Sequence, residues 1–443
     1  MKRRSFLRTS LGVGSSLLTG SFYSTKATAA PSERIRLGVI GLGSRGFNLI
    51  DDFLREPNAE IVAVCDVDRL HYRDRPWGKG RTFGREPARE YITKHAARKK
   101  KSGIHSGPDV YKDFREVCNR SDIDALVIAT PDHWHALCTL QGLKNGKDIY
   151  CEKPITHLFR EGQLVYQEVE KQKAVFQTGS QQRSMREFQM AVNLVRNGHL
   201  GKIQKFEVGL PPGYEKPMGS TKILTPRKDL DYNFWCGPSE ELPLMQARFH
   251  RWWRGNRAYG GGVLMDWIGH HNDIVHWALG VDLSGPTSVN AVNWIYPETK
   301  IYNTPFQYEI QTEYPGGITG SISSKNKQGL KIIGEDGWVY VRRGIINASQ
   351  RDWFKKGFKA GSHDVQASPG HARNFLDCIK SRKACIAPAE NAHRSITPGH
   401  LGYVSSQVGR SLKWDPKQEI IIGDEQANQI LNKMKYREGW VTS

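Results

Sequence analysis

Residues 34–55 read RIRLGVIGLGSRGFNLIDDFLR and hold the strongest indication of the fold. An apolar run ends at Ile40, three glycines follow in the spacing G-x-G-x-x-G, and a helical pattern of apolar residues then begins. The glycine motif alone is weak evidence, because glycine is common in this chain. Between a strand and a helix, it predicts the first turn of a dinucleotide-binding unit. The residues expected to contact the cofactor there are Gly41, Leu42, Gly43, Ser44, Arg45 and Gly46.

A second apolar strand supports this prediction. It lies in EIVAVCDVD and reaches Asp66, twenty residues after Gly46. An acid at this position accepts hydrogen bonds from the ribose hydroxyls of adenosine and repels a 2′-phosphate. We therefore expect NAD as the cofactor. NADP is the less favoured alternative, which Arg69 keeps open because it lies close by in the sequence.

Two further apolar strands point at the same crevice. One spans residues 125–129 and precedes TPDHWH, and the other lies in DIYCEKP. In an open parallel sheet, the carboxyl ends of the strands line the ligand crevice. The side chains expected there are Thr130, Pro131, His133, His135, Glu152 and Lys153. We also predict a cis peptide between Lys153 and Pro154, which would aim the ammonium group inward.

The positive charge of the chain is concentrated in two segments. The formal net charge is +19, the first 29 residues hold five bases and no acid, and residues 69–109 hold twelve bases and four acids. No recognition motif for nucleic acid accompanies them, so a nucleic-acid partner is not expected. We interpret residues 69–109 as a basic insertion whose run ARKKKSG is a solvated face, with binding of an anionic polymer as the alternative.

The N-terminus has the three parts of a twin-arginine export signal. RRSFLR begins at Arg3, a mildly apolar run follows, and Ala27-Thr28-Ala29 is a cleavage site of the A-x-A type. We therefore expect residues 1–29 to be a signal peptide and the mature protein to be periplasmic or otherwise exported. No other segment is continuously apolar over the roughly 18 residues of a membrane helix, so stable membrane insertion is not expected.

Five motifs together resemble the Gfo/Idh/MocA family of oxidoreductases, in the style of its secreted members. They are GVIGLGSRG, VCDVD, ATPDHWH, CEKP and GGGVLMDWIGHHNDI, and the resemblance covers nearly all of the mature chain. It implies an α/β protein with a Rossmann domain at 34–155. A second α/β domain at 156–370 would hold a large, open, mostly antiparallel sheet that serves as a homo-oligomer face. Residues 371–443 are expected to return as helices to the first domain.

Residues 260–280, GGGVLMDWIGHHNDIVHWALG, combine acids, histidines and tryptophans behind three glycines, which suggest close packing. A helix over 263–279 would bring four side chains to one stripe: Asp266, His270, Asp273 and Trp277. By resemblance this stripe faces the nicotinamide beside Lys153. The chain departs from the family pattern D-x-G-x-H-x-x-D, because Ile268 stands where glycine is usual and Gly269 follows it.

The chemistry of these side chains suggests their roles. Oxidation of a sugar carbinol needs a base for the hydroxyl proton, and His270 titrates near neutrality. Lys153 can stabilise the developing alkoxide or relay the proton itself, so the identity of the base stays open. Asp266 would orient His270 or bind a neighbouring hydroxyl. A metal is not expected, although the helix carries ligand types, because His271 lies across the helix from the other polar side chains.

Two further segments contribute candidate contacts. Aromatic rings stack on sugars, and FHRWWRG carries two tryptophans, for which core packing is the alternative. By resemblance, TGSQQRS lies near cofactor and substrate, with Gln181 on the cofactor side. The predicted substrate contacts are Lys153, Arg183, Trp252, Trp253, Asp266, His270 and Asp273.

The sequence thus predicts an exported NAD(P)-dependent oxidoreductase that transfers hydride between a carbinol carbon of a sugar or glycoside and a tightly bound nicotinamide. An exported protein meets no free nicotinamide pool, so turnover should be redox-neutral. One alternative is an NAD-dependent glycoside hydrolase or lyase that works by transient oxidation, elimination and reduction. Another is a non-catalytic sugar-binding protein that retains NAD, against which the intact Lys153, Asp266 and His270 argue.

Overall fold

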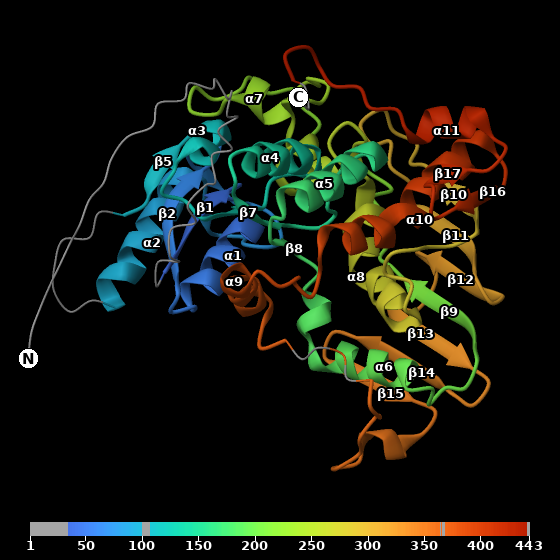
Figure 1. Cartoon of the computed structure of the whole chain (residues 1–443). Coiled ribbons are helices and arrows are strands. Elements are labelled where there is room, and N and C mark those ends of the chain that lie inside the picture. The colour runs from blue at the N-terminus through green and yellow to red at the C-terminus, as the bar shows by residue number, and fades with distance from the viewer. Residues whose placement is uncertain (1–33, 100–106, 364, 366–367, 441–443) are drawn as a thin grey trace, which may run out of the picture. The chain divides into compact units, whose positions relative to one another are not determined.

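The computed structural model describes residues 34–99, 107–363, 365 and 368–440. The predicted signal peptide, residues 1–29, and most of the ARKKKSG run lie outside the described residues. Two sheets organise the described chain, the first in its N-terminal part and the second in its C-terminal part (Figure 1). None of the described helices combines the length and the apolar character that a membrane crossing requires.

The first sheet has six parallel strands in the order β5-β2-β1-β6-β7-β8. Their bounds are β1 Ile35–Ile40, β2 Ala59–Cys65, β5 Asp109–Tyr111, β6 Ala125–Ile128, β7 Asp148–Cys151 and β8 Phe176–Thr178. This is the strand order of a dinucleotide-binding Rossmann fold, as predicted. The predicted domain boundary after residue 155 lies too early, however, because β8 pairs with β7 and extends the sheet to Thr178.

Both faces of the first sheet are buried, which explains the continuous apolar runs of its strands. Leu37 and Val39 of β1 belong to a core with side chains from three helices: α1 (Ser44–Leu54), α2 (Arg85–Lys99) and α9 (His371–Ser381). Ile40 faces the opposite core, formed with α3 (Phe114–Asn119), α4 (Asp132–Lys144) and α5 (Phe159–Gln172). The glycine-rich turn therefore follows the carboxyl end of β1, between the two helical layers that cover the sheet.

The second sheet has nine strands in the order β15-β14-β13-β9-β12-β11-β10-β16-β17. Their bounds are β9 Ile203–Gly209, β10 Ser288–Ile295, β11 Gln307–Tyr314, β12 Ile318–Ser323, β13 Gly329–Gly334, β14 Trp338–Arg342, β15 Ile345–Ala348, β16 Leu412–Asp415 and β17 Ile420–Ile421. Among the described strands of this sheet, β9 and β12 are paired in parallel, and every other pairing is antiparallel. The predicted large, mostly antiparallel sheet is confirmed.

Helices cover one face of this second sheet. They are α6 (Arg186–Arg196), α8 (Gly262–Leu279) and α10 (Ala389–Val408) (Figure 1). Strand β11 shows the resulting asymmetry, because Tyr308, Ile310 and Tyr314 are buried whereas Gln311 and Glu313 are exposed. The face that carries the exposed residues is the one predicted to join protomers, and that assembly stays a prediction.

The C-terminal part differs from the predicted set of helices. Helix α9 packs on the first domain as expected, with Phe375 against Phe53 and Tyr150. Strands β16 and β17 instead extend the second sheet, because the backbone of β16 pairs with β10. The tail therefore joins both sheets rather than the first alone.

Candidate active site

A cavity of about 470 Å³ lies where the strand ends of the first sheet meet α8. This size suits a small-molecule ligand. Its lining includes most of the residues that the sequence predicts: Gly41, Gly43, Ser44, Arg45, Asp66, Thr130, Pro131, His135, Glu152, Lys153, Gln181, Trp253, Asp266 and His270. Segments that are far apart in the sequence thus converge on one space.

The glycine-rich turn forms one wall of the cavity, and at Gly43 this wall carries no side chain. A Cβ at Gly43 would meet no atom within 4 Å, so this residue opens onto the cavity. Gly43 is also the N-cap of α1, and no side chain caps that helix end. The first N–H groups of α1 are therefore available to an anion such as a diphosphate. Gly46 serves packing instead, because a Cβ there would lie 2.0 Å from the carbonyl oxygen of Gly41.

Asp66 stands at the other end of this wall. Its Oδ2 accepts a hydrogen bond from the N–H of Leu42 at 2.6 Å, and its Oδ1 accepts one from the N–H of Asp68 at 2.9 Å. Burial, with the nearby Asp68, raises the pKa of Asp66 above its usual value. Each oxygen keeps a second lone pair for a ribose hydroxyl. The bare helix end and this carboxylate together fit a dinucleotide.

The reactive end of the cavity carries a tight ion cluster. The Nζ of Lys153 donates to Asp266 Oδ1 at 2.6 Å and to the carbonyl oxygen of Asp266 at 2.8 Å, and Arg254 Nε lies 3.2 Å from the same Oδ1. Burial alone would raise the pKa of Asp266, but Arg254 and Lys153 outweigh it and hold this pKa below its usual range. Asp266 is therefore a carboxylate. The Lys153–Pro154 peptide is cis, as predicted.

His270 lies beside this cluster in the neutral form. Burial, and then the charges of Lys153 and Arg343, lower its pKa well below the usual value. Arg343 Nη2 lies 3.1 Å from His270 Nε2, and because a guanidinium only donates, Nε2 is the accepting nitrogen. A neutral imidazole with a lone pair at Nε2 can accept a proton.

The start of α8 is packed as tightly as its glycines predict. A Cβ at Gly260 would lie 2.6 Å from the ring of Trp253 and 2.8 Å from Asp132 Oδ2. The departure at Ile268 and Gly269 leaves the helix unbroken. Ile268 is fully buried in the core, and a Cβ at Gly269 would make only ordinary contacts. The polar residues before and after this pair keep their helical positions.

Two predicted substrate contacts, Arg183 and Asp273, lie outside the cavity lining. Arg183 Nε is 2.7 Å from Asp273 Oδ2, Arg183 Nη2 is 2.6 Å from Asp282 Oδ1, and the side chains of Arg183 and Asp273 are 2% exposed. Trp277 completes this cluster, because its ring packs under the Arg183 guanidinium at 5.1 Å. The four side chains of the predicted stripe lie on α8, but only Asp266 and His270 line the cavity.

His133 and Trp252 also differ from the predictions. The ring nitrogens of His133 lie 3.0 Å from the carbonyl oxygen of Trp235 and 3.2 Å from that of Tyr259, which turns the ring away from the cavity. Trp252 packs edge-on against Tyr214, and its neighbour Trp253 lines the cavity instead. His133 and Trp252 therefore make contacts within the protein interior and do not line the cavity.

Several lining residues escaped the sequence analysis. Asp132 is buried at the start of α4, which raises its pKa to about 7, and its Oδ2 has no hydrogen-bond partner. Its position inside ATPDHWH, one of the recognised motifs, was the available signal. Arg254 of FHRWWRG, which the sequence already suggests as a sugar contact, lines the cavity beside Trp253. Arg73 and Arg251 also line the cavity, and no local pattern marks Arg73, which lies in the insertion.

The insertion closes over the glycine-rich turn through a hairpin of β3 (His71–Tyr72) and β4 (Thr82–Phe83). The hydroxyl of Ser44 donates to the carbonyl oxygen of Trp77 at 2.6 Å, and the N–H of Gly84 donates to the carbonyl oxygen of Leu42 at 3.0 Å. The hairpin therefore covers the part of the cavity that fits the diphosphate.

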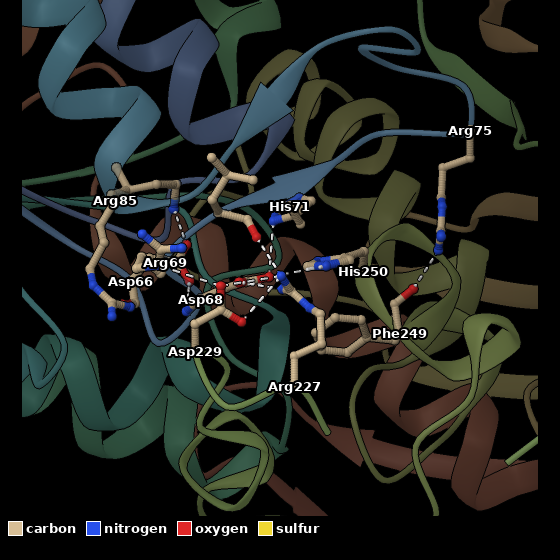
Figure 2. Close-up of polar contacts among 12 residues, drawn as sticks. Asp66, Asp68, Arg69, His71, Arg75, Arg85, Arg227, Asp229, Phe249 and His250 are labelled. Atoms are coloured by element: carbon tan, nitrogen blue, oxygen red, sulfur yellow. Dashed lines mark hydrogen bonds and ion pairs between the residues drawn. The ribbon is translucent and has the colours of Figure 1, made fainter. Parts of the chain in front are cut away.

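Asp68 ties this hairpin to a distant segment of the chain (Figure 2). Its Oδ1 is 2.6 Å from Arg227 Nη2, and its Oδ2 is 3.1 Å from His71 Nδ1 and 3.5 Å from His250 Nε2. Among the described residues, Asp68, His71 and His250 form a group whose residue types and spacing could hold a metal ion. The two imidazoles stack with ring centroids 3.7 Å apart.

Two family models match the chain. The model described as "Oxidoreductase family, NAD-binding Rossmann fold" matches residues 35–180, and the model described as "Oxidoreductase family, C-terminal alpha/beta domain" matches residues 186–442. Among curated proteins, an alpha-N-acetylgalactosaminidase of Shewanella oneidensis is 28% identical over 175 residues, which are 40% of this chain and 34% of that protein. A glycosyl hydrolase family 109 protein of Shewanella sp. (strain ANA-3) matches to the same extent. The match thus spans about a third of the length of these relatives.

Solved structures share the fold. The aldose-aldose oxidoreductase from Caulobacter crescentus complexed with glycerol has a TM-score of 0.60 and 17% identity, over 86% of this chain and 99% of that chain. The WlbA dehydrogenase from Bordetella pertussis, in complex with NADH and UDP-GlcNAcA, has a TM-score of 0.59 and 18% identity, over 86% and 98%. At such identities the likeness shows the fold alone. With both domains matched by their family models, the chain belongs to the Gfo/Idh/MocA family of NAD-binding oxidoreductases.

Proposed function

We propose that this protein oxidises a carbinol carbon of a sugar or glycoside with a tightly held NAD and then discharges the hydride to a sugar-derived carbonyl. The observation that carries the proposal is the convergence of Lys153, Asp266 and His270 on the cavity that also holds Gly43 and Asp66. A charged donor and a neutral base thus share one space with the dinucleotide wall.

The side chains divide the proton chemistry between them. His270 is neutral and takes the hydroxyl proton at Nε2, once the substrate hydroxyl replaces the exposed Arg343 there. The Lys153 ammonium, held by Asp266, donates a hydrogen bond to the same substrate oxygen and stabilises its developing negative charge. Bound nicotinamide supplies the hydride acceptor. Asp266 positions Lys153 rather than His270, because its carboxylate oxygen faces the ammonium group.

The same residues suit a second candidate function, net hydrolysis of a glycoside through transient oxidation, elimination of the substituent and reduction. The names of the curated relatives, a galactosaminidase and a glycosyl hydrolase, favour it. Oxidation next to a C–H bond acidifies that bond, and His270 or Asp132 could then take its proton. The two functions share their first step and differ in the product.

We expect export through the twin-arginine signal at residues 1–29 and assembly through the open face of the second sheet. NAD is preferred over NADP because Asp66 occupies the ribose position, while Arg69 is already paired with Glu86 and Asp229. The hairpin over Ser44 would slow release of the dinucleotide, which suits a compartment without a nicotinamide pool.

A direct experiment separates these functions. The mature protein is purified, its bound nucleotide is extracted and identified, and the protein is incubated with a panel of sugars and glycosides without added cofactor. A keto-sugar formed together with a reduced co-substrate supports the oxidoreductase, and free aglycone without net oxidation supports the hydrolase. Sugar binding with neither product, in wild type and Lys153→Met alike, would leave only the non-catalytic alternative.

A further inference from the structure

Two guanidinium groups in the cavity lining, the buried Arg73 and the partly buried Arg251, have no ion-pair partner among the described residues. Arg73 is 6% exposed and lines the cavity beside Arg251, and the Nε of each is buried without a hydrogen bond. The other cations of the lining are engaged: Arg45 with Glu152, Lys112 with Asp231, Lys153 and Arg254 with Asp266, and Arg343 with His270. Arg73 and Arg251 stand apart from this pattern.

Burying a charge without a counter-charge is costly. A fold that keeps the guanidiniums of Arg73 and Arg251 in one cavity is therefore suited to an anionic ligand. Burial, and then the charges of Arg75 and Arg251, lower the pKa of Arg73 to about 10, which still leaves it charged at neutral pH. Arg251 is held in place by the rings of Trp77 and Trp252, at 5.7 and 5.3 Å. The Arg251 guanidinium is therefore held in place before any ligand arrives.

Two anions could reach this pair, the cofactor diphosphate and an acidic group of the substrate. The diphosphate is placed by the bare end of α1, and Trp77 contacts that end through Ser44. The electrostatic neighbours of Arg251, however, include Tyr214, Arg254 and Asp266, which belong to the reactive end. This favours the substrate as the source of the anion.

We propose that Arg73 and Arg251 form a binding subsite for an anionic group, a carboxylate or sulfate, on the sugar substrate. The inference rests on the proposed function and narrows its substrate class to acidic sugars. Guanidiniums suit this role, because their N–H groups match the oxygens of a carboxylate or sulfate in pairs. Trp253 and Tyr214 line the same space and offer apolar surface to the sugar ring.

The test compares matched pairs of neutral and acidic sugars, such as methyl glucoside with methyl glucuronide, in several ring configurations. Binding to the NAD-loaded protein is measured by calorimetry, so the readout does not depend on turnover. We expect wild type to prefer the acidic member of a pair about 10- to 100-fold, the range of a charge-assisted contact. Arg73→Met and Arg251→Met should each reduce this preference about tenfold.

Two control variants sharpen the result. Arg73→Lys keeps the charge and should restore part of the preference, which also excludes misfolding as the cause. Arg55→Met removes an arginine that follows the last residue of α1 and whose side chain is 70% exposed, and it should leave the preference unchanged. Bound nucleotide is quantified in every variant.

The outcomes are distinct. A preference for acidic sugars that disappears in Arg73→Met at unchanged nucleotide content supports the subsite. No preference for acidic sugars in wild type overturns the subsite. A loss of bound NAD in the variants without a change in preference also overturns it and assigns Arg73 and Arg251 to the diphosphate. If acidic sugars bind selectively but are neither oxidised nor cleaved, the subsite stands and the proposed function fails.

Discussion

Two ion clusters lie along α8, and only one of them faces the cavity. Asp266 pairs with Lys153 and Arg254 in the lining, whereas Asp273 pairs with Arg183 in the sealed interior. The two acids are seven residues apart, about 10 Å along the helix, and share one helical stripe. Residue type and helical period are therefore the same in both. What separates a reactive cluster from a structural one here is access to a ligand.

The largest expected effect is on the sealed cluster. Arg183→Met would leave the buried Asp273 and the partly exposed Asp282 without their cation, and the unpaired Asp273 should lower the free energy of unfolding by about 3–5 kcal/mol. Urea denaturation measures the loss. Lys153→Met is the matched control, because Asp266 keeps Arg254 at 3.2 Å and should lose much less. Equal destabilisation by both variants would contradict the division between the clusters.

Lys153→Met should instead abolish chemistry. Without the ammonium group, no fixed charge stabilises the developing alkoxide, and the rate of the hydride step should fall by roughly 10²–10³-fold. Single-turnover kinetics of the NAD-loaded protein check this, with nucleotide content and melting temperature recorded alongside. A rate close to wild type would remove Lys153 from the reaction.

His270→Gln should show its role in the pH profile. The pKa of His270 lies below the usual 6.5, so kcat/KM of wild type should fall only on the acid side of that value, as the imidazole becomes protonated. The variant should be about 100-fold slower and should lack this acidic limb. If the limb survives in His270→Gln, another group is the base, and Asp132 becomes the first candidate.

The protonation of Asp132 in the cavity should make the free energy of unfolding depend on pH. Its pKa is raised by burial to about 7 from an ordinary 3.8, so the folded state holds the proton while the unfolded state loses it. The contribution of protonated Asp132 to stability is thus complete below pH 3.8 and is lost as the pH rises to about 7. Asp132→Asn should escape this loss, and its advantage in unfolding free energy should grow by about 2 kcal/mol between about pH 5 and about pH 8. Melting curves at the two pH values test this, and a constant difference would refute it.

The smallest expected effect concerns metal. Asp68 is already bound by Arg227, and the imidazoles of His71 and His250 stack on each other. We propose that these groups anchor the hairpin without a metal. Elemental analysis should find well below one ion per chain, and chelation should leave activity unchanged. One bound zinc or iron per chain would overturn this account.

Local backbone geometry in this chain is predictable from its sequence, whereas tertiary packing is not. The dinucleotide wall was predictable because Gly41, Gly43 and Asp66 act through backbone geometry that is local to one strand-turn-helix unit. Lys153, Asp266 and His270 were placed by motifs in which spacing and residue type coincide. Asp273 looked equivalent to Asp266, since nothing in a helical period tells where a cavity ends. That Arg73 and Arg251 line the same cavity could not be predicted, because only tertiary packing brings the insertion next to residues 250–255.

The most direct test of the central claim follows the near-ultraviolet absorbance of reduced nicotinamide in the purified protein, mixed with substrate and no added cofactor. This band should appear in wild type without release of nucleotide and should then decay when an acceptor sugar is added. It should not form in Lys153→Met. A wild-type protein that carries NAD, binds the sugar and shows no such band would contradict the account.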